Sequence, residues 1–362
     1  MANYKLLRRS ILCFISCLSF IACSSGGESS DDELPQETEL ANLQLDVAIQ
    51  GQSSANPNGD GSGKVTLNFS ADNATSYRIS FGNGENAETT SNSYTYTYTG
   101  SGVTDYEIYV SAYKGSKFIS KKEEISVYVA PGLIWADEFD GSGKPNSNNW
   151  AYDLGAGGWG NNEAEYYTDR LENAKVENGV LKITAKKESF EGANYTSARL
   201  KTQGKFSFKY GKVEVRAKLP EGGGTWPAIW MLGSNITSVG WPACGEIDIM
   251  EHVGNKMGHV SSAIHTPSSY GNTQNVGVTD VTNVSSEFHV YGMEWTAQKI
   301  AFSVDGNVFY TYNPSDKNDQ TWPFNKDQFI ILNVAMGGNL GGSIDPDFTS
   351  GIMEVDYVRV YQ

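Results

Sequence analysis

Short runs in which apolar and polar residues alternate, separated by turn residues, extend over most of the chain and constrain its fold more than any other feature. Val213-Glu-Val-Arg-Ala-Lys-Leu219 alternates with a period of two, and Met353 to Tyr361 does the same at the end of the chain. Asp305-Gly-Asn307 lies between two such runs, as expected of a β-hairpin turn. No long stretch keeps the 3.6-residue apolar period of a helix. The sequence therefore predicts an all-β protein.

The runs fall into two groups, and the first occupies residues 43–130. Its members are about five residues long, with turn residues between them, a spacing typical of a small β-sandwich. The predicted strands are Val65–Phe69, Ser76–Phe81, Tyr94–Tyr98, Tyr106–Val110 and Ile125–Val129. The turn Phe81-Gly-Asn-Gly-Glu85 resembles that of the polycystic-kidney-disease-type immunoglobulin-like module, although Asn83 replaces its usual Asp. We expect this unit to act as a spacer; weak glycan binding is the alternative.

The second group occupies residues 133–362. Its predicted strands are Phe206–Tyr210, Val213–Leu219, Lys299–Val304, Val308–Tyr312 and Met353–Tyr361. About 230 residues of antiparallel strands fit one large β-sandwich, a jelly roll. A curved sheet of that kind offers a long groove of the shape that a polysaccharide chain requires.

The N-terminus has the features of an export signal. Lys5, Arg8 and Arg9 precede the apolar run 11–22, which is too short to span a bilayer as a stable helix. Residues 1–22 are therefore predicted to be a signal peptide. The run ends in Phe20-Ile-Ala-Cys23, which resembles a bacterial lipoprotein box whose Cys23 becomes acylated. An ordinary signal peptide with an incidental cysteine is the alternative.

Residues 23–42 are rich in Ser, Gly, Asp and Glu and predict a flexible tether. An acidic Ser-rich tract after the acylated cysteine resembles the signal that sends Bacteroidetes lipoproteins to the outer face of the outer membrane. The expected location is therefore the outer membrane, with a lipid anchor and the protein facing the cell exterior. We expect the chain to be a monomer.

Charge and cysteine content exclude several classes of function. The formal net charge of −15 argues against nucleic acid as a partner, because phosphate binding needs a basic surface. The chain has four cysteines, two of them in the apolar N-terminal run, so no disulfide framework is available. Four scattered histidines without Cys-x-x-Cys pairs argue against zinc. We expect Cys244 to be a small buried residue.

Three carboxylates are crowded into one predicted strand. Glu246 and Asp248 point to the same face, whereas Glu251 falls one residue late for that face. A β-bulge would return Glu251 to it, with Met250 as the extra residue, packed inward. Like charges so close together raise at least one pKa. Retaining glycoside hydrolysis uses two such carboxyl groups about 5–5.5 Å apart, one as nucleophile and one as acid/base.

In that chemistry Asp248 would hold Glu246 and Glu251 in opposite protonation states. Spacing alone leaves two alternatives open, a solvated strand face with alternating acids and a cluster that binds calcium. The sequence context decides against both.

The segment Gly240 to His252 closely resembles the active-site signature of glycoside hydrolase family 16, in particular its laminarinase-like members. The resemblance covers nearly all of residues 133–362 and continues through motifs in the right order. These are Trp135–Phe139, Gly158–Glu163, Tyr166–Thr168, Tyr210–Arg216, Trp226–Leu232, Phe288–Trp295, Trp322–Phe324 and Asn333–Gly338.

The resemblance implies a concanavalin A-like jelly roll and retaining endo-hydrolysis of β-1,3-glucan. It makes Glu246 the nucleophile, Asp248 the assisting acid and Glu251 the acid/base. A hydrolase of mixed-linkage β-1,3-1,4-glucan or galactan within the same family is one alternative. A non-catalytic glycan-binding lipoprotein is another, although that class commonly lacks one of the two glutamates. No cofactor is expected for catalysis.

The same resemblance suggests residues that line the cleft. Trp226, Trp230 and Trp241 are candidates for stacking on sugar rings, with core packing as the alternative. Asn162, Arg199 and His265 are expected beside them. Glu165 departs from the family pattern, which usually has Gln at this position.

Many family members hold one structural calcium between an early Glu and a late Asp. In this chain the corresponding residues are Glu138 and Asp356, with a backbone carbonyl near Gly179. Oxygen ligands suit calcium. Two ordinary acids near strand ends are the alternative.

Overall fold

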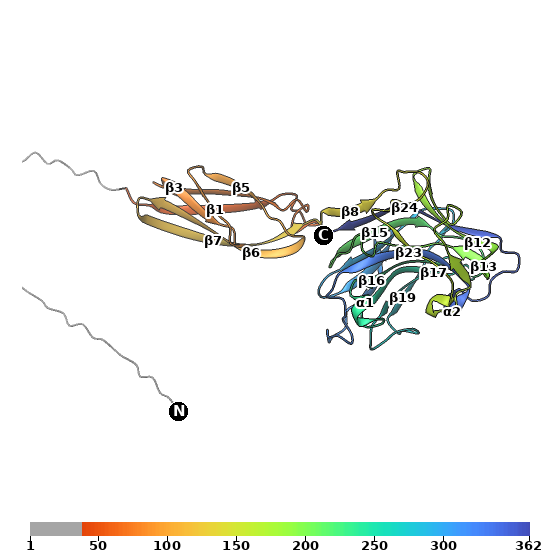
Figure 1. Cartoon of the computed structure of the whole chain (residues 1–362). Helices are drawn as coiled ribbons and strands as arrows, with labels where there is room; N and C mark the ends of the chain where they lie inside the picture. The colour runs from red at the N-terminus through yellow and green to blue at the C-terminus, as the bar shows by residue number, and fades with distance from the viewer. Residues whose placement is uncertain (1–37) are drawn as a thin grey trace, which may run out of the picture.

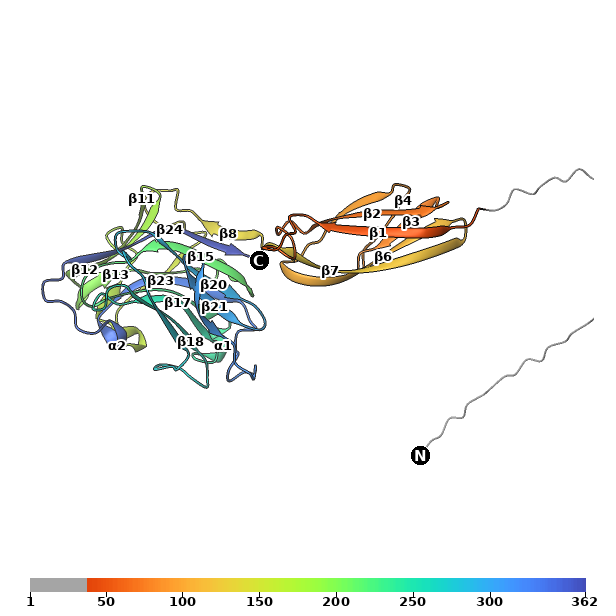
Figure 2. The same ribbon diagram turned by 180° about the vertical axis from the view of Figure 1, so that it is seen from behind.

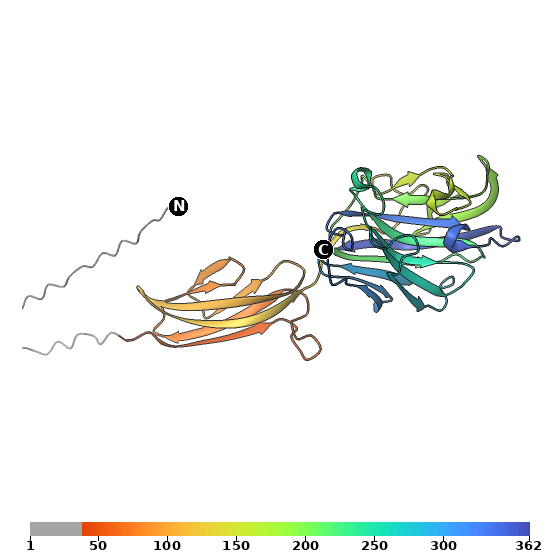
Figure 3. The same ribbon diagram turned by 90° about the horizontal axis from the view of Figure 1, so that it is seen from below.

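The computed structural model describes residues 38–362, which form two β domains arranged end to end (Figures 1 and 3). The predicted signal peptide, the lipidation site at Cys23 and most of the predicted tether lie outside the described residues. Within residues 38–362 no helix is long and apolar enough to cross a membrane. The prediction of an all-β fold is confirmed, because the helices among these described residues are a few single turns.

The N-terminal domain is a sandwich of two antiparallel sheets. One sheet has the order β1 (Ala41–Ile49), β2 (Lys64–Asp72), β5 (Ser93–Thr97). The other has the order β4 (Asn86–Thr89), β3 (Ser76–Ser80), β6 (Gly102–Lys114), β7 (Lys117–Val129). Alternate residues such as Leu67, Ile79 and Val110 are fully buried between the sheets. The domain begins at Ala41, two residues before the predicted boundary, because β1 pairs with β2 from that residue onward.

The turn after β3 requires its glycine. Gly82 has a φ of 79°, and a Cβ there would lie 2.7 Å from the carbonyl oxygen of Glu107. The ring of Tyr96 stacks on Phe81 with 3.8 Å between ring centroids, and the Tyr98 hydroxyl donates a hydrogen bond to the Phe81 carbonyl. These contacts hold the turn against the core. The resemblance to the polycystic-kidney-disease-type module stays a prediction.

Two large sheets, antiparallel except for one parallel pair of strands at an edge, pack face to face in the C-terminal domain and form the predicted jelly roll. A sheet of ten strands covers one side and a sheet of seven strands the other. The first has the order β10 (Glu165–Tyr167), β13 (Ala193–Ser197), β12 (Val180–Phe190), β24 (Ser350–Tyr361), β15 (Gly211–Lys218), β20 (His289–Trp295), β21 (Ile300–Val304), β22 (Asn307–Tyr312), with β11 (Ala174–Glu177) beside β12 and β8 (Leu133–Asp137) beside β24. The second has the order β19 (Val276–Asp280), β18 (His259–His265), β17 (Glu246–His252), β16 (Thr225–Gly233), β23 (Gln328–Met336), β14 (Arg199–Lys201), β9 (Ala151–Asp153). The short helical turns are η1 (Gly158–Gly160), α1 (Ile236–Val239) and α2 (Gly338–Gly341).

Burial follows the alternation of the sequence. In β16, Ile229 and Met231 enter the core between the sheets, whereas Trp226 and Trp230 face the other way. The predicted hairpin is confirmed: Asp305 and Gly306, with φ of 51° and 78°, connect β21 to β22. A two-residue turn with two positive φ values matches the twist of the flanking strands.

The strand predicted at Phe206–Tyr210 is wrong. The backbone turns at Thr202, whose carbonyl accepts hydrogen bonds from Lys205 and Phe206, and Phe208 makes only an isolated bridge to Gln328. The alternation there reflects aromatic packing, since the ring of Phe206 stacks on Trp135 at 4.9 Å. A partly buried ring at Phe206 and a buried ring at Phe208 therefore imitate a strand in a segment that is mostly turn.

The end of the chain is tied to the segment between the domains. The backbone N–H of Gly132 donates to the carbonyl of Gln362 at 3.0 Å, and the N–H of Gln362 donates to Gly132 at 2.9 Å. β8, which follows the linker, also pairs with β24 (Figure 2). The C-terminal strand thus closes the C-terminal domain at the point where the N-terminal domain is attached.

Candidate active site

A cleft of about 810 Å³ crosses the face of the seven-stranded sheet that is turned away from the core. Its walls come from β14, β16, β17, β18 and β23 together with loops at both ends of the sheet. Trp226 and Trp230 of β16, with Trp241 from the loop before β17, line it. All three tryptophans therefore take the predicted position, and Trp241 is 45% exposed.

A β-bulge in β17 brings the three predicted carboxylates to the cleft. Against β16 the register runs from Ile229–Met250 to Trp230–Asp248, so Ile249 has no partner on that side. Ile249 and Met250 are both buried in the core, and the Ser262 hydroxyl donates to the Ile249 carbonyl at 2.7 Å.

The predicted bulge is therefore present, but Ile249, not Met250, is the residue left unpaired against β16. Two consecutive side chains pack inward, so the strand resumes its alternation one residue later. Glu246, Asp248 and Glu251 consequently all line the cleft.

Each of the two glutamates accepts a hydrogen bond from a tryptophan of the cleft. The indole N–H of Trp241 donates to Oε2 of Glu246 at 2.8 Å. The indole N–H of Trp226 donates to Oε1 of Glu251 at 3.0 Å. These bonds hold the carboxyl groups in fixed orientations and still leave one oxygen of each free to act on a substrate.

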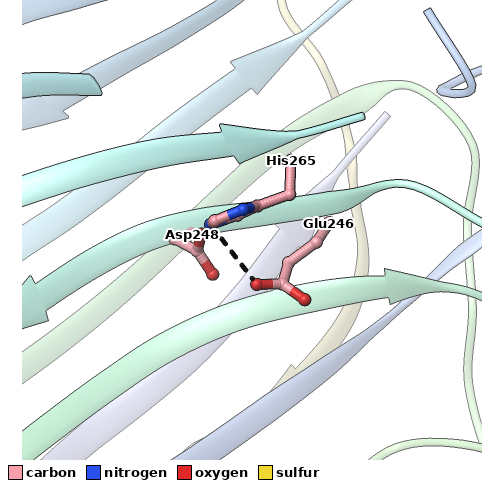
Figure 4. A group of neighbouring side chains, drawn as sticks. All are labelled: Glu246, Asp248 and His265. Atoms are coloured by element: carbon pink, nitrogen blue, oxygen red, sulfur yellow. Dashed lines mark ion pairs between the residues drawn. The ribbon is translucent and has the colours of Figure 1, made fainter. Parts of the chain in front are cut away.

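His265 lies beside Glu246, at one end of the carboxylate row. It lies directly opposite Glu246 in the register of β17 and β18. Its Nε2 is 3.2 Å from Oδ2 of Asp248 and 3.6 Å from Oε1 of Glu246 (Figure 4). The predicted position of His265 in the cleft is thus observed, and its ring faces the Glu246 end of the row.

Burial dominates the electrostatics of the carboxylate row and raises the pKa of all three members. Burial, followed by repulsion from Asp248, raises the pKa of Glu251 to about 8. The same causes raise the pKa of Glu246 to about 8. His265 and a tryptophan N–H, from Trp241 at Glu246 and from Trp226 at Glu251, act in the opposite direction on both glutamates. Burial also raises the pKa of Asp248. The row therefore retains protons at neutral pH, and of its two glutamates Glu246 is the one within 3.6 Å of the His265 ring.

Arg199 takes its predicted place, whereas Asn162 does not. The guanidinium of Arg199 lies 4.6 Å from the centroid of the Trp230 ring and its Nε is 3.0 Å from Oδ2 of Asp153. Asn162 is exposed, has a left-handed backbone with φ of 59°, and is not among the residues that line the cleft, although its side chain donates to Asn339, which is. Its neighbours Asn161 and Glu163 line the cleft instead.

Asn333 is a cleft residue that sequence reasoning missed as an individual position. It is 6% exposed and accepts a hydrogen bond of 2.7 Å from the indole N–H of Trp230. A lone amide in the otherwise apolar stretch Phe329–Met336 is a signal that could have revealed it. Cys244 is buried and free, as predicted, and burial raises the pKa of its thiol to about 11.

The side chains proposed for calcium do not fit a cation as they are arranged. Both oxygens of Glu138 accept hydrogen bonds of 2.8 Å from Arg359. Oδ2 of Asp356 accepts one of 2.6 Å from Arg216. Gly179 does lie in the turn between β11 and β12, next to β24. A cation there would compete with two guanidinium groups, so calcium stays a prediction and no step of the chemistry involves it.

Comparison with known proteins agrees with this site. Residues 161–359 match the family described as Glycosyl hydrolases family 16. The Beta-glucanase of Rhodothermus marinus is 47% identical over 243 residues, which are 64% of this chain and 85% of that protein. The laminarinase of Flavobacterium sp. UMI-01 has a crystal structure that is 47% identical, with a TM-score of 0.61, covering 64% of this chain and 100% of that one.

A Keratan-sulfate endo-1,4-beta-galactosidase of Sphingobacterium multivorum is also similar, at 39% identity over 238 residues. The match covers 64% of this chain and spans about half the length of that relative (55%). The family match lies within the domain that carries the cleft and includes its carboxylate row. The chain belongs to glycosyl hydrolase family 16.

Proposed function

We propose that this protein is a retaining endo-hydrolase of β-1,3-glucan of the laminarin type. The observation that carries the proposal is the carboxylate row: Glu246 and Glu251 line one cleft, each held by a tryptophan N–H, with His265 at the Glu246 end. Similarity to proteins described as beta-glucanase and laminarinase supports β-glucan as the substrate class.

The proposed reaction has two displacements. In the first, Glu246 attacks the anomeric carbon and the glycosidic C–O bond breaks. The departing oxygen takes the bonding electrons and a proton from Glu251, leaving a glycosyl ester on Glu246. In the second, Glu251 removes a proton from water, whose oxygen attacks the same carbon and releases Glu246. Two inversions at one carbon retain the β configuration.

A panel of polysaccharides tests the substrate assignment. Laminarin, lichenan, agarose, carrageenan and keratan sulfate are incubated with the full chain, and the products are separated by size. We expect laminarin to be cleaved fastest, with oligosaccharides of several lengths from the start, as an endo mode requires. The galactans are included because one relative is described as a galactosidase. Cleavage of a galactan without cleavage of laminarin would overturn the assignment.

Asp248 is proposed to maintain the different charge states of the two glutamates. Its carboxyl is 4% exposed and contacts His265 at 3.2 Å. We expect Asp248→Asn to lower kcat for laminarin roughly 10- to 100-fold, the scale of losing one contact between charged groups, here the contact with His265. KM should change much less, because the Asp248 carboxyl is almost fully buried and offers little surface to a bound substrate. A kcat within about twofold of wild type would show that Asp248 has only a packing role.

We further propose that a lipid on Cys23 anchors the protein to the outer membrane, with residues 41–129 as a spacer. Support comes from the sequence of residues 1–42 alone. With Cys23→Ala in a bacterial host, we expect the protein to move from the membrane to the soluble fraction and to lose incorporated palmitate. Its activity on laminarin serves as the control and should stay unchanged. Membrane association of the variant equal to that of wild type would contradict the anchor.

A further inference from the structure

A second pair of carboxyl groups, Glu163 and Glu165, lies behind one wall of the cleft. Glu163 lines the cleft, whereas Glu165, at the start of β10, is fully buried. Oε2 of Glu165 accepts a hydrogen bond of 2.6 Å from the backbone N–H of Met336. Its Oε1 faces no hydrogen-bond donor among the described residues. The two side chains lie within hydrogen-bonding reach of each other.

The hydrogen bonds around Glu163 have one possible direction. An indole N–H can only donate, so the Trp230 N–H fixes Oδ1 of Asn333 toward itself, at 2.7 Å. The Asn333 amide N–H therefore donates to the Tyr167 hydroxyl at 3.1 Å. Tyr167 must then direct its own proton to Oε2 of Glu163, 3.0 Å away. The chain of donors runs from the cleft floor to the Glu163 carboxylate.

The other oxygen of Glu163 is also an acceptor. The Asn161 side-chain N–H donates to its Oε1 at 3.2 Å. Glu163 is thus bonded as a carboxylate, with donors on both oxygens. Two ionised carboxylates cannot hydrogen-bond to each other, so the contact with Glu165 is favourable only if Glu165 carries the proton. Burial, followed by the charge of Glu163, raises the pKa of Glu165 well above its usual range.

We propose that Glu165 is a positioning residue for substrate binding, whose protonated carboxyl donates a hydrogen bond to Glu163 and so holds the chain Glu163–Tyr167–Asn333 that orients Trp230. The role in substrate binding rests on the proposed function, since Trp230 forms part of the floor of the cleft. The protonation of the pair follows from the hydrogen bonds alone.

Few charged groups lie near Glu163 and Glu165 that could balance a second negative charge if Glu165 lost its proton. On its own strand Glu165 is followed by Tyr166 and Tyr167, and β13 places Tyr195 opposite it. The end of β23 contributes the amide of Met336 but no titratable side chain. The cation that acts on this network is Arg199 of β14, whose charge reaches Tyr167. Loss of the Glu165 proton would therefore place two negative charges side by side and loosen the chain of donors.

The direction of the pH effect follows from the raised pKa. A carboxyl whose folded-state pKa lies above its unfolded value stabilises the fold at low pH. That contribution is lost as the pH rises through the folded-state pKa. We therefore expect alkaline pH to lower both the melting temperature and the substrate affinity of the wild type. Gln at position 165 keeps a donor toward Glu163 and an acceptor for Met336, yet cannot ionise.

The test compares the full chain with Glu165→Gln from about pH 5 to about pH 9, a range that spans the titration of a raised carboxyl. Across this range the KM of the wild type for laminarin should rise several-fold, whereas that of Glu165→Gln should rise less than about twofold. The pH dependence of kcat should be the same in both, because the catalytic row is unchanged. The exposed Glu172→Gln is the control and should follow the wild type.

Melting temperatures provide a readout without substrate. The difference between Glu165→Gln and wild type should grow as the pH rises. Superimposable melting profiles would overturn the acid pair, whatever the activity, and superimposable KM profiles would overturn its role in binding. Absence of laminarin hydrolysis in the wild type would instead count against the proposed function. If Glu165→Gln fails to fold, Glu163→Gln replaces it. Removing the charge of Glu163 should weaken the pH dependence of the melting temperature, with burial alone still raising the pKa of Glu165, and an unchanged dependence would overturn the acid pair.

Discussion

Replacing Glu246 with alanine is expected to lower the rate of laminarin hydrolysis by more than about 10⁴-fold, because no covalent intermediate can form without the nucleophile. Its loss also leaves the Trp241 N–H without its carboxylate partner, and His265 with Asp248 alone. Reducing-sugar release by the full chain measures the effect. The melting temperature shows whether the variant is folded, and Glu172→Gln serves as the matched control for an exposed glutamate.

Azide makes this test specific for a nucleophile. The shortened side chain leaves space in which an azide ion can attack the anomeric carbon in place of Glu246. A single displacement inverts that centre, so the product from a β-linked substrate with a reactive leaving group should be the α-glycosyl azide. Activity close to wild type, or a β-glycosyl azide as the product, would contradict the nucleophile role of Glu246.

Replacing Glu251 with alanine is expected to have the second largest effect, with a strong dependence on the leaving group. Hydrolysis of laminarin should fall about 10²- to 10⁴-fold, the usual contribution of general acid–base catalysis. An aryl β-glucoside whose phenol is already acidic needs no proton to depart. Formation of the glycosyl enzyme from that substrate should therefore stay close to the wild-type rate, as measured by the initial burst of phenol.

Azide should distinguish this variant from the first. In Glu251→Ala the nucleophile Glu246 remains, and azide replaces water in the second displacement. Two inversions then give the β-glycosyl azide. An equal loss of activity on laminarin and on the aryl glucoside would remove the acid role of Glu251. In the wild type, the pKa of about 8 keeps this acid protonated at neutral pH, and the rate should fall as the pH rises past that value.

The regular parts of the fold could be predicted from the sequence because their pattern is local. Alternation over a few residues gave strands such as β15 and β24, and Asp305-Gly-Asn307 gave the hairpin between β21 and β22. The strand predicted at Phe206–Tyr210 is absent, because the alternate burial there arises from ring stacking on Trp135 and not from pairing with a neighbouring strand.

The carboxylate row was predictable for a different reason. The distance in sequence between Asp248 and Glu251 does not fit simple alternation, so any fold that uses both must contain a bulge. Which residue is left unpaired depends on the register with β16, and this cannot be known from one strand. The prediction that Asn162 lines the cleft missed by one position. The direction of its side chain depends on a left-handed backbone conformation within a turn, which the sequence does not reveal.

The hydrogen-bond network behind the cleft could not be predicted from the sequence. Glu165 is connected to Trp230 through Glu163, Tyr167 and Asn333. Glu165 and Tyr167 lie on β10, Trp230 on β16 and Asn333 on β23. No local spacing indicates that a buried acid lies against Glu163. The direction of its hydrogen bonds follows only once the indole N–H of Trp230 is placed against Asn333.

The most direct test of the account is a ¹H NMR time course of laminarin with the full wild-type chain. It follows the new reducing ends before the two anomers equilibrate. Attack by Glu246 followed by water predicts that the β-anomer signal appears first and the α-anomer signal grows in later by mutarotation. An initial α-anomer signal, or no new reducing ends, would contradict a retaining β-1,3-glucan hydrolase built on Glu246 and Glu251.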